Sequence, residues 1–205
     1  MNTIDTINAI IAERRIIKPE DFSGEIIEDS IITQIIENAH WAPNHGRTEP
    51  WEFFVFSGEG RKKMGQINLA VYQQITAEPD PAVMEKLESR PQLASHIIGV
   101  CMKRGTNPKI PRMEEILATA CAVQNMLLTA HTYGLGAYWS TGSYTLSLHD
   151  ALPIGSYTHN NAINHHFGLS DEDLFLGYIY LGKMDKANPT GKRNQTGIAK
   201  TVFIQ

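Results

Sequence analysis

The stretch from Ala42 to Trp51 holds the residues of this chain that are best suited to contact a ligand. It carries His45 and Arg47 between two prolines, and it joins a segment with helical periodicity to a β-prone one. Turn-forming residues with hydrogen-bond donors and an aromatic ring, held on a rigid scaffold, are typical of ligand-binding loops. The block alone leaves a second interpretation open, in which Trp51 fills the core and His45 caps a neighbouring element.

Two groups of cations lie near the two ends of the sequence. Arg14 and Arg15, followed closely by Lys18, come after a helical segment, and Lys192 and Arg193 stand together near the C-terminus. Guanidinium groups bind phosphate through paired N–H donors, so either group could hold a phosphate. The alternative is a solvated helix end, where cations also interact favourably with the helix dipole.

A glycine-bounded segment over 134–142 contains Trp139, Ser140 and Thr141 in succession. Small hydroxyl side chains beside an aromatic ring could hold a flat ligand ring and its polar edge. The segment does not match GxGxxG, and the sequence contains no Walker A motif. A Rossmann or P-loop nucleotide site therefore has no support.

The sequence predicts neither a metal site nor a catalytic dyad or triad. His159, His165 and His166 lie in a polar stretch, but their spacing is not HExxH and no carboxylate or cysteine partners accompany them. No Ser/His/Asp or Cys/His arrangement can be argued from the spacing.

The composition favours one globular domain over residues 1–205. Apolar residues make up 42% and charged residues 20%, and the net charge of -4 gives no reason to expect nucleic acid or an anionic membrane as a partner. No apolar run is long enough to span a bilayer. Cys101 and Cys121 form no metal-spaced cluster, so we expect two buried thiols in a reducing, cytoplasmic setting.

The order of predicted elements indicates an α+β fold, because helices and strands mix without the alternation of a doubly wound sheet. Helices are predicted from residue 4 to Arg14-Arg15, over 31–39 with Asp29 or Ser30 as N-cap, over 61–76 and over 114–133. Strands are predicted over 51–57, 96–102, within 134–142 and over 176–183. Residues 79–91 read as a lid or short helix, and the β-prone tail over 201–204 could pair with this sheet or with a partner's edge.

A short direct repeat lies within the C-terminal half. Gly142-Ser-Tyr-Thr145 recurs as Gly155-Ser-Tyr-Thr158, and residues 144–154 between them read YTLSLHDALPI. That run resembles, codon by codon, the translation of a widely used short-read sequencing adapter. The hypothesis is that about thirteen residues are an assembly artefact and that Gly142 naturally continues into Ser156. The alternative is a genuine surface-loop insertion, which folds tolerate well.

Together, these motifs resemble those of the nitroreductase family of FMN-dependent oxidoreductases. The resemblance rests on the Arg-Arg helix end with its following Lys, the A-P-x-H-x-x-x-x-P-W block leading into an F-F-V strand, the E-G-x-R turn, the long alanine-rich helix and G-x-G-x-x-W-x-x-G. It covers nearly the whole chain apart from the suspected insertion. The region from Ala42 to Arg61 is especially similar to the smaller NAD(P)H nitroreductases of bacteria. A dimeric fold with a central mixed or antiparallel sheet flanked by helices follows from this resemblance.

The resemblance also implies how FMN would be held. Arg14 and Arg15, with the backbone N–H of Ile16, would bind the phosphate and ribityl chain. Lys18 would lie near the flavin N1–C2=O edge, where a cation stabilises the negative charge of the reduced ring. Family members often carry Ser in place of Ile16, so only the backbone donor is expected there.

Both subunits of a homodimer would contribute to each flavin site. His45, with Trp41 nearby, would contact FMN from the other subunit. The first subunit would supply the remaining residues, namely Trp139, Ser140 and Thr141 along the flavin, and Lys192 and Arg193 at the phosphate.

The function implied is reduction of a small-molecule oxidant such as a nitroaromatic or quinone, with NAD(P)H as co-substrate, by a ping-pong mechanism. The flavin supplies the redox chemistry, so no side-chain acid or base is required. Two alternatives remain open. One is a member of the same fold with other flavin chemistry, such as flavin fragmentation or dehalogenation, and the other is a non-catalytic FMN-binding protein.

Overall fold

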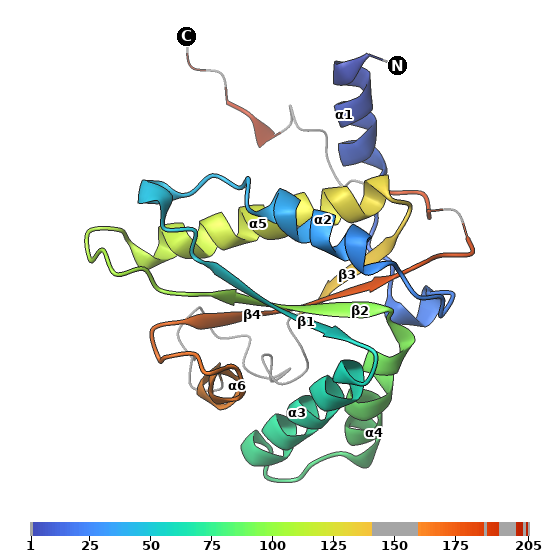
Figure 1. Ribbon diagram of the computed structural model, residues 1–205, viewed down its shortest axis with the longest axis vertical. Helices are drawn as coiled ribbons and strands as arrows, with labels where there is room; N and C mark the ends of the chain where they lie inside the picture. The colour runs from blue at the N-terminus through green and yellow to red at the C-terminus, as the bar shows by residue number, and fades with distance from the viewer. Residues whose placement is uncertain (1, 141–159, 187, 193–199, 203, 205) are drawn as a thin grey trace.

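The computed structural model describes residues 2–140, 160–186, 188–192, 200–202 and 204 (Figure 1). The helices are α1 (Thr3–Glu13), α2 (Asp29–Ala39), α3 (Gly60–Ile75), α4 (Pro81–Ser89), α5 (Arg112–Thr132) and α6 (Asn160–Phe167). The strands are β1 (Trp51–Ser57), β2 (His96–Met102), β3 (Gly136–Ser140) and β4 (Leu174–Gly182). Short 3-10 turns cover Pro19–Asp21, His45–Arg47 and Arg90–Leu93.

The four strands form an antiparallel sheet in the order β1-β2-β4-β3. Every residue of β2 is buried, because β2 is a central strand with both faces covered. Side chains alternate between the faces of a strand. Ile98 and Val100 therefore join the core beneath α2 and α5, whereas Ile97 and Cys101 join the core on the opposite face. Figure 1 shows α2 and α5 on one face of the sheet and α3, α4 and α6 on the other.

The long helix α5 anchors the layer that it forms with α2. Its inner face carries small and medium apolar residues, among them Ala118, Ala122 and Met126, and these pack against Ile35 of α2 and the sheet. Full burial of a side chain the size of isoleucine or methionine stabilises the fold by roughly 1.5–3 kcal/mol. The same helix runs past both candidate ligand-binding regions, which makes α5 the reference element for the site.

Most of the predicted elements are confirmed. Strands β1 and β2 have the predicted bounds, and α1, α3, α5, β3 and β4 differ from their predicted ranges only at the ends. The acidic segment predicted as a lid or short helix contains the helix α4. The predicted apolar stripe of α2 is also present, with Ile32, Ile35 and Ala39 buried.

Two detailed predictions are wrong. The N-cap of α2 is Glu28, without a side-chain capping bond, and not Asp29 or Ser30. The Asp29 carboxylate instead lies 3.0 Å from Nε2 of the buried His96, so it pairs across to β2 and does not cap its own helix. Cys101 is buried as expected, but Cys121 is exposed because it lies on the outward face of α5.

The C-terminal tail does not add a strand to the sheet of this single chain. Thr201, Val202 and Ile204 lie in no strand, and Val202 and Ile204 are 84% and 94% exposed. Pairing of the tail with a partner's sheet edge stays a prediction. The repeat and the suspected insertion over 144–154 lie outside the described residues. In the part of the chain that the structure describes, no helix is long and apolar enough to cross a membrane.

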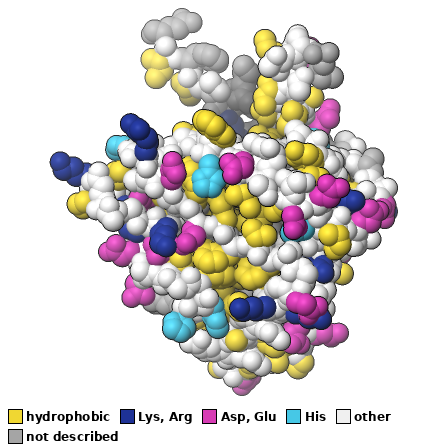
Figure 2. Space-filling model, in the orientation of Figure 1, with side chains coloured by type: hydrophobic (Ala, Val, Ile, Leu, Met, Phe, Trp, Pro, Cys, Tyr) yellow, Lys and Arg dark blue, Asp and Glu magenta, His cyan; other side chains and the backbone are white. Residues whose placement is uncertain are grey.

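Helix α1 projects from the body of the molecule and has no buried residue (Figure 1). Three of its four isoleucines are exposed, Ile4 by 69%, Ile7 by 44% and Ile11 by 52%, and Ile10 is half-buried. Figure 2 shows hydrophobic side chains along this projecting helix. An amphipathic helix normally buries its apolar stripe, and within this chain α1 does not.

Candidate functional site

The first half of the candidate site is the segment that follows α1. The N–H of Arg14 donates to the carbonyl of Ile10 and closes the helix, after which the backbone becomes extended. The N–H of Ile17 then donates to the carbonyl of Ala137 over 3.1 Å, which fixes the segment against the start of β3. Ile17 is therefore buried, whereas Ile16 is 61% exposed. This attachment holds Arg14, Arg15 and Lys18 at one end of β3.

Arg15 connects the end of α1 to the segment before Lys192. Its guanidinium donates to the carbonyls of Ala12 at 2.7 Å, Arg14 at 2.8 Å and Pro189 at 3.1 Å. It also lies directly against Gly191, where an added Cβ would collide with the guanidinium group. The family resemblance implied that the two cation groups belong to one site, and the structure brings residues 189–191 to Arg15. Arg193 lies outside the described residues.

The other cations of this region have no acidic partner among the described residues. Arg14, Lys18, Lys186 and Lys192 form none of the ion pairs found there. A hollow of about 190 Å³ in the same region is lined by Ile16, Ile17, Asp21, Met184, Lys186 and Pro189, so one cation and one carboxylate border it directly. A group of cations without acidic partners suits a phosphate or another anion.

Trp139, the aromatic residue of the glycine-bounded segment, lies on β3 two residues beyond Ala137, whose carbonyl accepts from the Ile17 N–H. Trp139 shares a face of β3 with Ala137, because residues two apart on a strand point the same way. Its indole N–H donates to the carbonyl of Leu176 over 3.0 Å, which fixes the ring, and its side chain is partly exposed. Ser140 ends the strand. Thr141 lies outside the described residues.

The loop from Ala42 to Trp51 forms the second half of the candidate site and combines both interpretations of that block. Trp51 is buried, and its indole N–H donates to Nδ1 of His40 over 3.1 Å, so this tryptophan is structural. His45 begins an exposed 3-10 turn, and its Nδ1 lies 2.6 Å from Oε2 of Glu114 on α5. Trp41 is 84% exposed.

The two halves lie at opposite ends of α5. His45 contacts Glu114 in the first turn of the helix. The segment next to Arg15 contacts the last turn, where Asn188 Nδ2 lies 3.3 Å from Nδ1 of His131. At 1.5 Å per residue these two points on α5 are roughly 25 Å apart. One chain therefore cannot bring His45 and the cations after α1 to the same small ligand.

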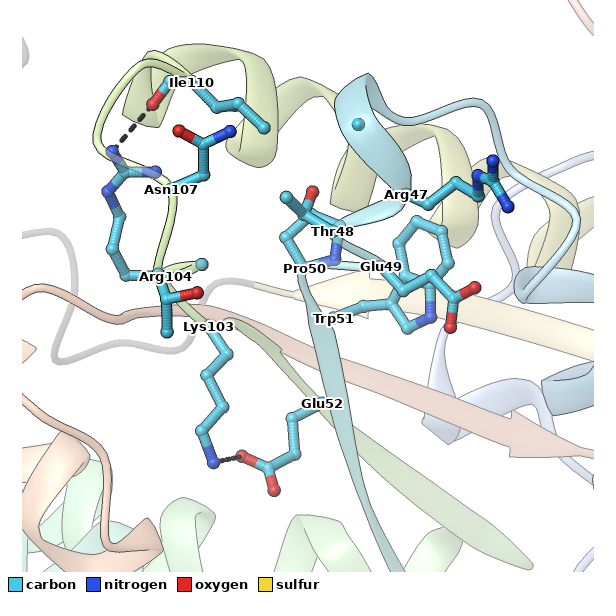
Figure 3. A pocket seen from close by; sticks show the side chains of 13 residues that line it. Arg47, Thr48, Glu49, Pro50, Trp51, Glu52, Lys103, Arg104, Asn107 and Ile110 are labelled. Atoms are coloured by element: carbon cyan, nitrogen blue, oxygen red, sulfur yellow. Dashed lines mark hydrogen bonds and ion pairs between the residues drawn. The ribbon is translucent and has the colours of Figure 1, made fainter.

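A larger hollow, of about 540 Å³, lies beside the His45 turn and was not predicted (Figure 3). Its walls are residues 46–52 on one side and residues 103–107 with Ile110 on the other. Figure 3 shows Thr48 and Pro50 facing the second wall, while Arg47 and Glu49 point away from it. The backbone is left-handed at Gly46, Arg47 and Glu49, with φ of 63°, 54° and 43°. The only sequence feature of this wall is the adjacent basic pair Lys103 and Arg104 directly after a buried strand, which indicates a loop but not a hollow.

The second wall is fixed by a buried ion pair. Arg104 pairs with Glu115, which is 1% exposed, and also donates to the carbonyl of Ile110 over 2.7 Å. The N–H of Gly105 donates to the other oxygen of Glu115 at 3.0 Å. At the edge of the wall, Lys103 donates to Glu52 over 3.1 Å, and this bond raises the pKa of Lys103. Because Arg104 is paired with Glu115, it offers no free charge to a ligand in the hollow.

Asp173 anchors the same segment from the start of β4. Burial alone would raise the pKa of its carboxyl group, but the N–H groups of Arg104 and Ser170 and the hydroxyl of Ser170 donate to it. These bonds favour the charged form and lower the pKa below its usual value. The segment from Lys103 to Ile110 is therefore fixed at both ends.

Comparison with known proteins places the whole chain in one family. Residues 11–183 match the model described as the Nitroreductase family. Putative NAD(P)H nitroreductase YdjA of Escherichia coli (strain K12) is 34% identical over 143 residues, which cover 69% of each protein. Putative NAD(P)H nitroreductase YfhC of Bacillus subtilis (strain 168) is 30% identical over 189 residues, covering 90% of this chain and 87% of the relative.

Solved structures agree. The nitroreductase-like family protein from Bacillus cereus superposes with a TM-score of 0.80 at 28% identity and covers 100% of this chain, with 99% of its own chain matched. The FMN-dependent nitroreductase NfnB from Mycobacterium smegmatis, solved in complex with NADPH, shares the fold with a TM-score of 0.67 at 15% identity, and both chains are fully covered. The family model spans most of the sequence, and both relatives, which are at least 30% identical to this chain, are named nitroreductases. This chain therefore belongs to the Nitroreductase family.

Proposed function

We propose that this protein is an FMN-dependent oxidoreductase that uses NAD(P)H to reduce nitroaromatic, quinone or related electron-poor substrates. The observation that carries the proposal is that the unpaired cations after α1 lie on a segment attached to β3, the strand that also carries Trp139. A phosphate-bearing flat ring is the ligand that needs both features at once. The NAD(P)H nitroreductase names of the relatives, and the FMN and NADPH of NfnB, support the same cofactor and co-substrate.

The donor set fits the phosphate end of FMN. In the part of the chain that the structure describes, the Ile16 N–H donates to no protein acceptor, and Arg14 and Lys192 make no ion pair. We assign these groups to the phosphate, together with Arg193. We also assign to it the N–H groups of the Arg15 guanidinium that do not donate to the three carbonyl partners. Lys18 would lie at the flavin edge and stabilise negative charge there. Trp139, Ser140 and Thr141 would hold the ring.

A second subunit would complete the site. The hollow beside Ile16 measures about 190 Å³, below the roughly 300–1,000 Å³ of typical small-molecule sites. The partner subunit in a homodimer would add its own Trp41 and His45, which one chain holds at the far end of α5. Exposed apolar side chains on α1 and on the outer face of α5, including Met113 and Leu117, support burial against another copy.

When bound, FMN would supply the redox chemistry, and the protein would bind, orient and exclude water. NAD(P)H and the oxidant would use the same face of the site in turn, which is a ping-pong scheme. No side-chain acid or base is needed for it. The two cysteines are unpaired, which agrees with the cytoplasmic location that we propose.

The absorbance spectrum of the purified protein tests the cofactor. We expect a yellow protein, or one that becomes yellow when FMN is added and the excess is removed by gel filtration. A preparation that remains colourless after this treatment would overturn the FMN assignment.

Anaerobic addition of NADH or NADPH then tests the reaction. Bleaching of the flavin absorbance, followed by recovery on adding a nitroaromatic or a quinone, is the expected result. A flavin that binds but is never reduced would indicate the non-catalytic alternative. Loss of the flavin chromophore, or halide release from a halogenated substrate, would indicate the other chemistries of this fold.

A further inference from the structure

His45 is held by a carboxylate from another element. Its Nδ1 lies 2.6 Å from Oε2 of Glu114, slightly closer than the roughly 2.7–2.9 Å of a charge-assisted N–H···O hydrogen bond. The two side chains are 60% and 46% exposed, and they come from positions far apart in the sequence. An ion pair this exposed contributes little to the stability of a fold. Its short contact therefore calls for another explanation.

The surroundings of the pair are rigid on both sides. Next to Glu114, the buried Glu115 pairs with Arg104 and accepts from the Gly105 N–H, so the first turn of α5 is fixed. At the end of the loop that carries His45, the Thr119 hydroxyl of α5 lies 3.1 Å from the Pro50 carbonyl and 2.9 Å from the Glu115 carbonyl, so its one proton is shared between the loop and the helix. Glu114 is thus held in a fixed position, from which its carboxylate contacts His45.

The turn that carries His45 is conformationally constrained as well. Gly46 has φ of 63°, and a Cβ at this position would come within 2.9 Å of Cδ1 of Ile110. Arg47 follows in the left-handed region, which residues with a Cβ seldom adopt. Strained backbone of this kind is kept where the direction of a side chain matters. Here it lies in the two residues that directly follow His45.

We propose that Glu114 is a positioning residue that holds the His45 ring with Nδ1–H directed at its carboxylate and Nε2 presented to the ligand. A carboxylate accepts hydrogen bonds only, so the proton lies on Nδ1 whenever the imidazole is neutral. The partner's flavin then meets a single tautomer in a single orientation. This inference rests on the proposed function for the identity of the ligand, but not for the state of the ring.

A double-mutant cycle tests the proposal through FMN affinity. The variants are Glu114→Gln, His45→Gln and the two combined, with FMN binding followed by quenching of flavin fluorescence. We expect Glu114→Gln to raise the FMN Kd about three- to tenfold when His45 is present, and to have no further effect in the His45→Gln background. The matched control is Glu85→Gln, an exposed glutamate on α4 across the sheet, which should leave the FMN Kd unchanged. An equal effect of Glu114→Gln in both backgrounds would overturn the proposal.

The ring itself gives a readout that needs no cofactor. Long-range ¹H–¹⁵N correlation of the histidine side chains, with His45 assigned by its loss in His45→Gln, reports which nitrogen carries the proton. We expect the Nδ1–H form in the wild type and a mixture or the Nε2–H form in Glu114→Gln. An unchanged tautomer would overturn the proposal even if FMN binds. A wild-type protein that binds no FMN would overturn the proposed function, while the tautomer experiment would still decide the role of Glu114.

Discussion

Arg15 lies in the candidate phosphate site, but most of its hydrogen bonds go to the protein backbone. The sequence suggested a direct phosphate contact, because paired arginines commonly bind phosphate. In the structure three of its hydrogen bonds go to the carbonyls of Ala12, Arg14 and Pro189. Arg15 therefore joins the end of α1 to the segment that leads into Lys192, and the geometry of the phosphate site depends on this junction.

Replacement of Arg15 by lysine tests that role. A single ammonium cannot reproduce a fork that reaches three carbonyls, and bonds from a charged donor are worth about 1.5–3 kcal/mol each. We expect Arg15→Lys to weaken FMN binding roughly tenfold or more, as measured by flavin fluorescence titration.

The matched control for this substitution is Arg61→Lys. Arg61 also donates to three carbonyls, those of Gly58, Gln92 and Ala94, but it lies at the start of α3, away from the site. The control should lower the melting temperature by a similar amount and leave the FMN Kd unchanged. If both variants weaken FMN binding equally, Arg15 acts only through general stability.

At the same residue scale, the sequence identified the candidate ligand-binding residues but not their neighbours. The pairing of His45 with Glu114 joins positions with no local signal between them, because a glutamate in the first turn of a helix is already favoured there by the helix dipole. Trp51 illustrates the opposite case. Its apolar, β-prone surroundings indicated a strand, and the strand buries it.

At the scale of elements, periodicity and residue type decided how much could be predicted. Strands β1 and β2 have continuous apolar and aromatic sequences, and both were predicted with the correct bounds. Helix α6 was missed because its sequence, NNAINHHF, is polar and short. The hollow beside the His45 turn could not be predicted either, since its two walls come from separate loops that only the β1–β2 pairing brings together.

Asp173 is one of two carboxylates that hold the loop between β2 and α5, and its contribution should appear as a pH effect on stability. The pKa of Asp173 is lower in the folded protein than its ordinary value of about 3.9. A group of this kind stabilises the fold fully above its unfolded pKa, and the stabilisation is lost as the pH falls through the folded pKa. Asp173→Asn removes it.

Urea unfolding at pH 7 and pH 3 measures this contribution. We expect Asp173→Asn to lower the free energy of unfolding by about 1–3 kcal/mol at pH 7, and the difference from the wild type to shrink at pH 3. Asp171→Asn, which changes an exposed aspartate two residues away, should show little effect at either pH. A difference between wild type and Asp173→Asn that is equal at both pH values would contradict the assigned ionisation.

At the scale of the whole molecule, two features of the single chain favour a homodimer. Its two candidate ligand-binding regions lie at opposite ends of α5, roughly 25 Å apart by helix geometry. Its projecting helix α1 leaves Ile4, Ile7 and Ile11 in solvent. Both observations are explained if a second copy packs against α1 and brings its own His45 to the cations of the first chain.

Two charged residues introduced on the apolar side of α1 test this arrangement. Ile7 and Ile11 lie one helical turn apart and are 44% and 52% exposed, so the double variant Ile7→Glu/Ile11→Glu should not disturb the fold of the single chain. If α1 packs against a partner, two buried, unpaired carboxylates would be strongly destabilising at the interface. We expect the wild type to have the mass of a dimer by light scattering, and the variant to be a monomer that has lost most of its FMN absorbance.

The control places the same change on an apolar residue of comparable exposure elsewhere. Leu93, in the turn after α4, is 42% exposed, and Leu93→Glu should remain dimeric and yellow. Far-ultraviolet circular dichroism should show that both variants keep their secondary structure. A wild-type monomer that holds FMN fully, or a monomeric α1 variant that retains FMN with unchanged affinity, would show that each chain builds its site alone. In that case His45, held at the far end of α5, would have to serve a different ligand from the one beside Arg14 and Lys18.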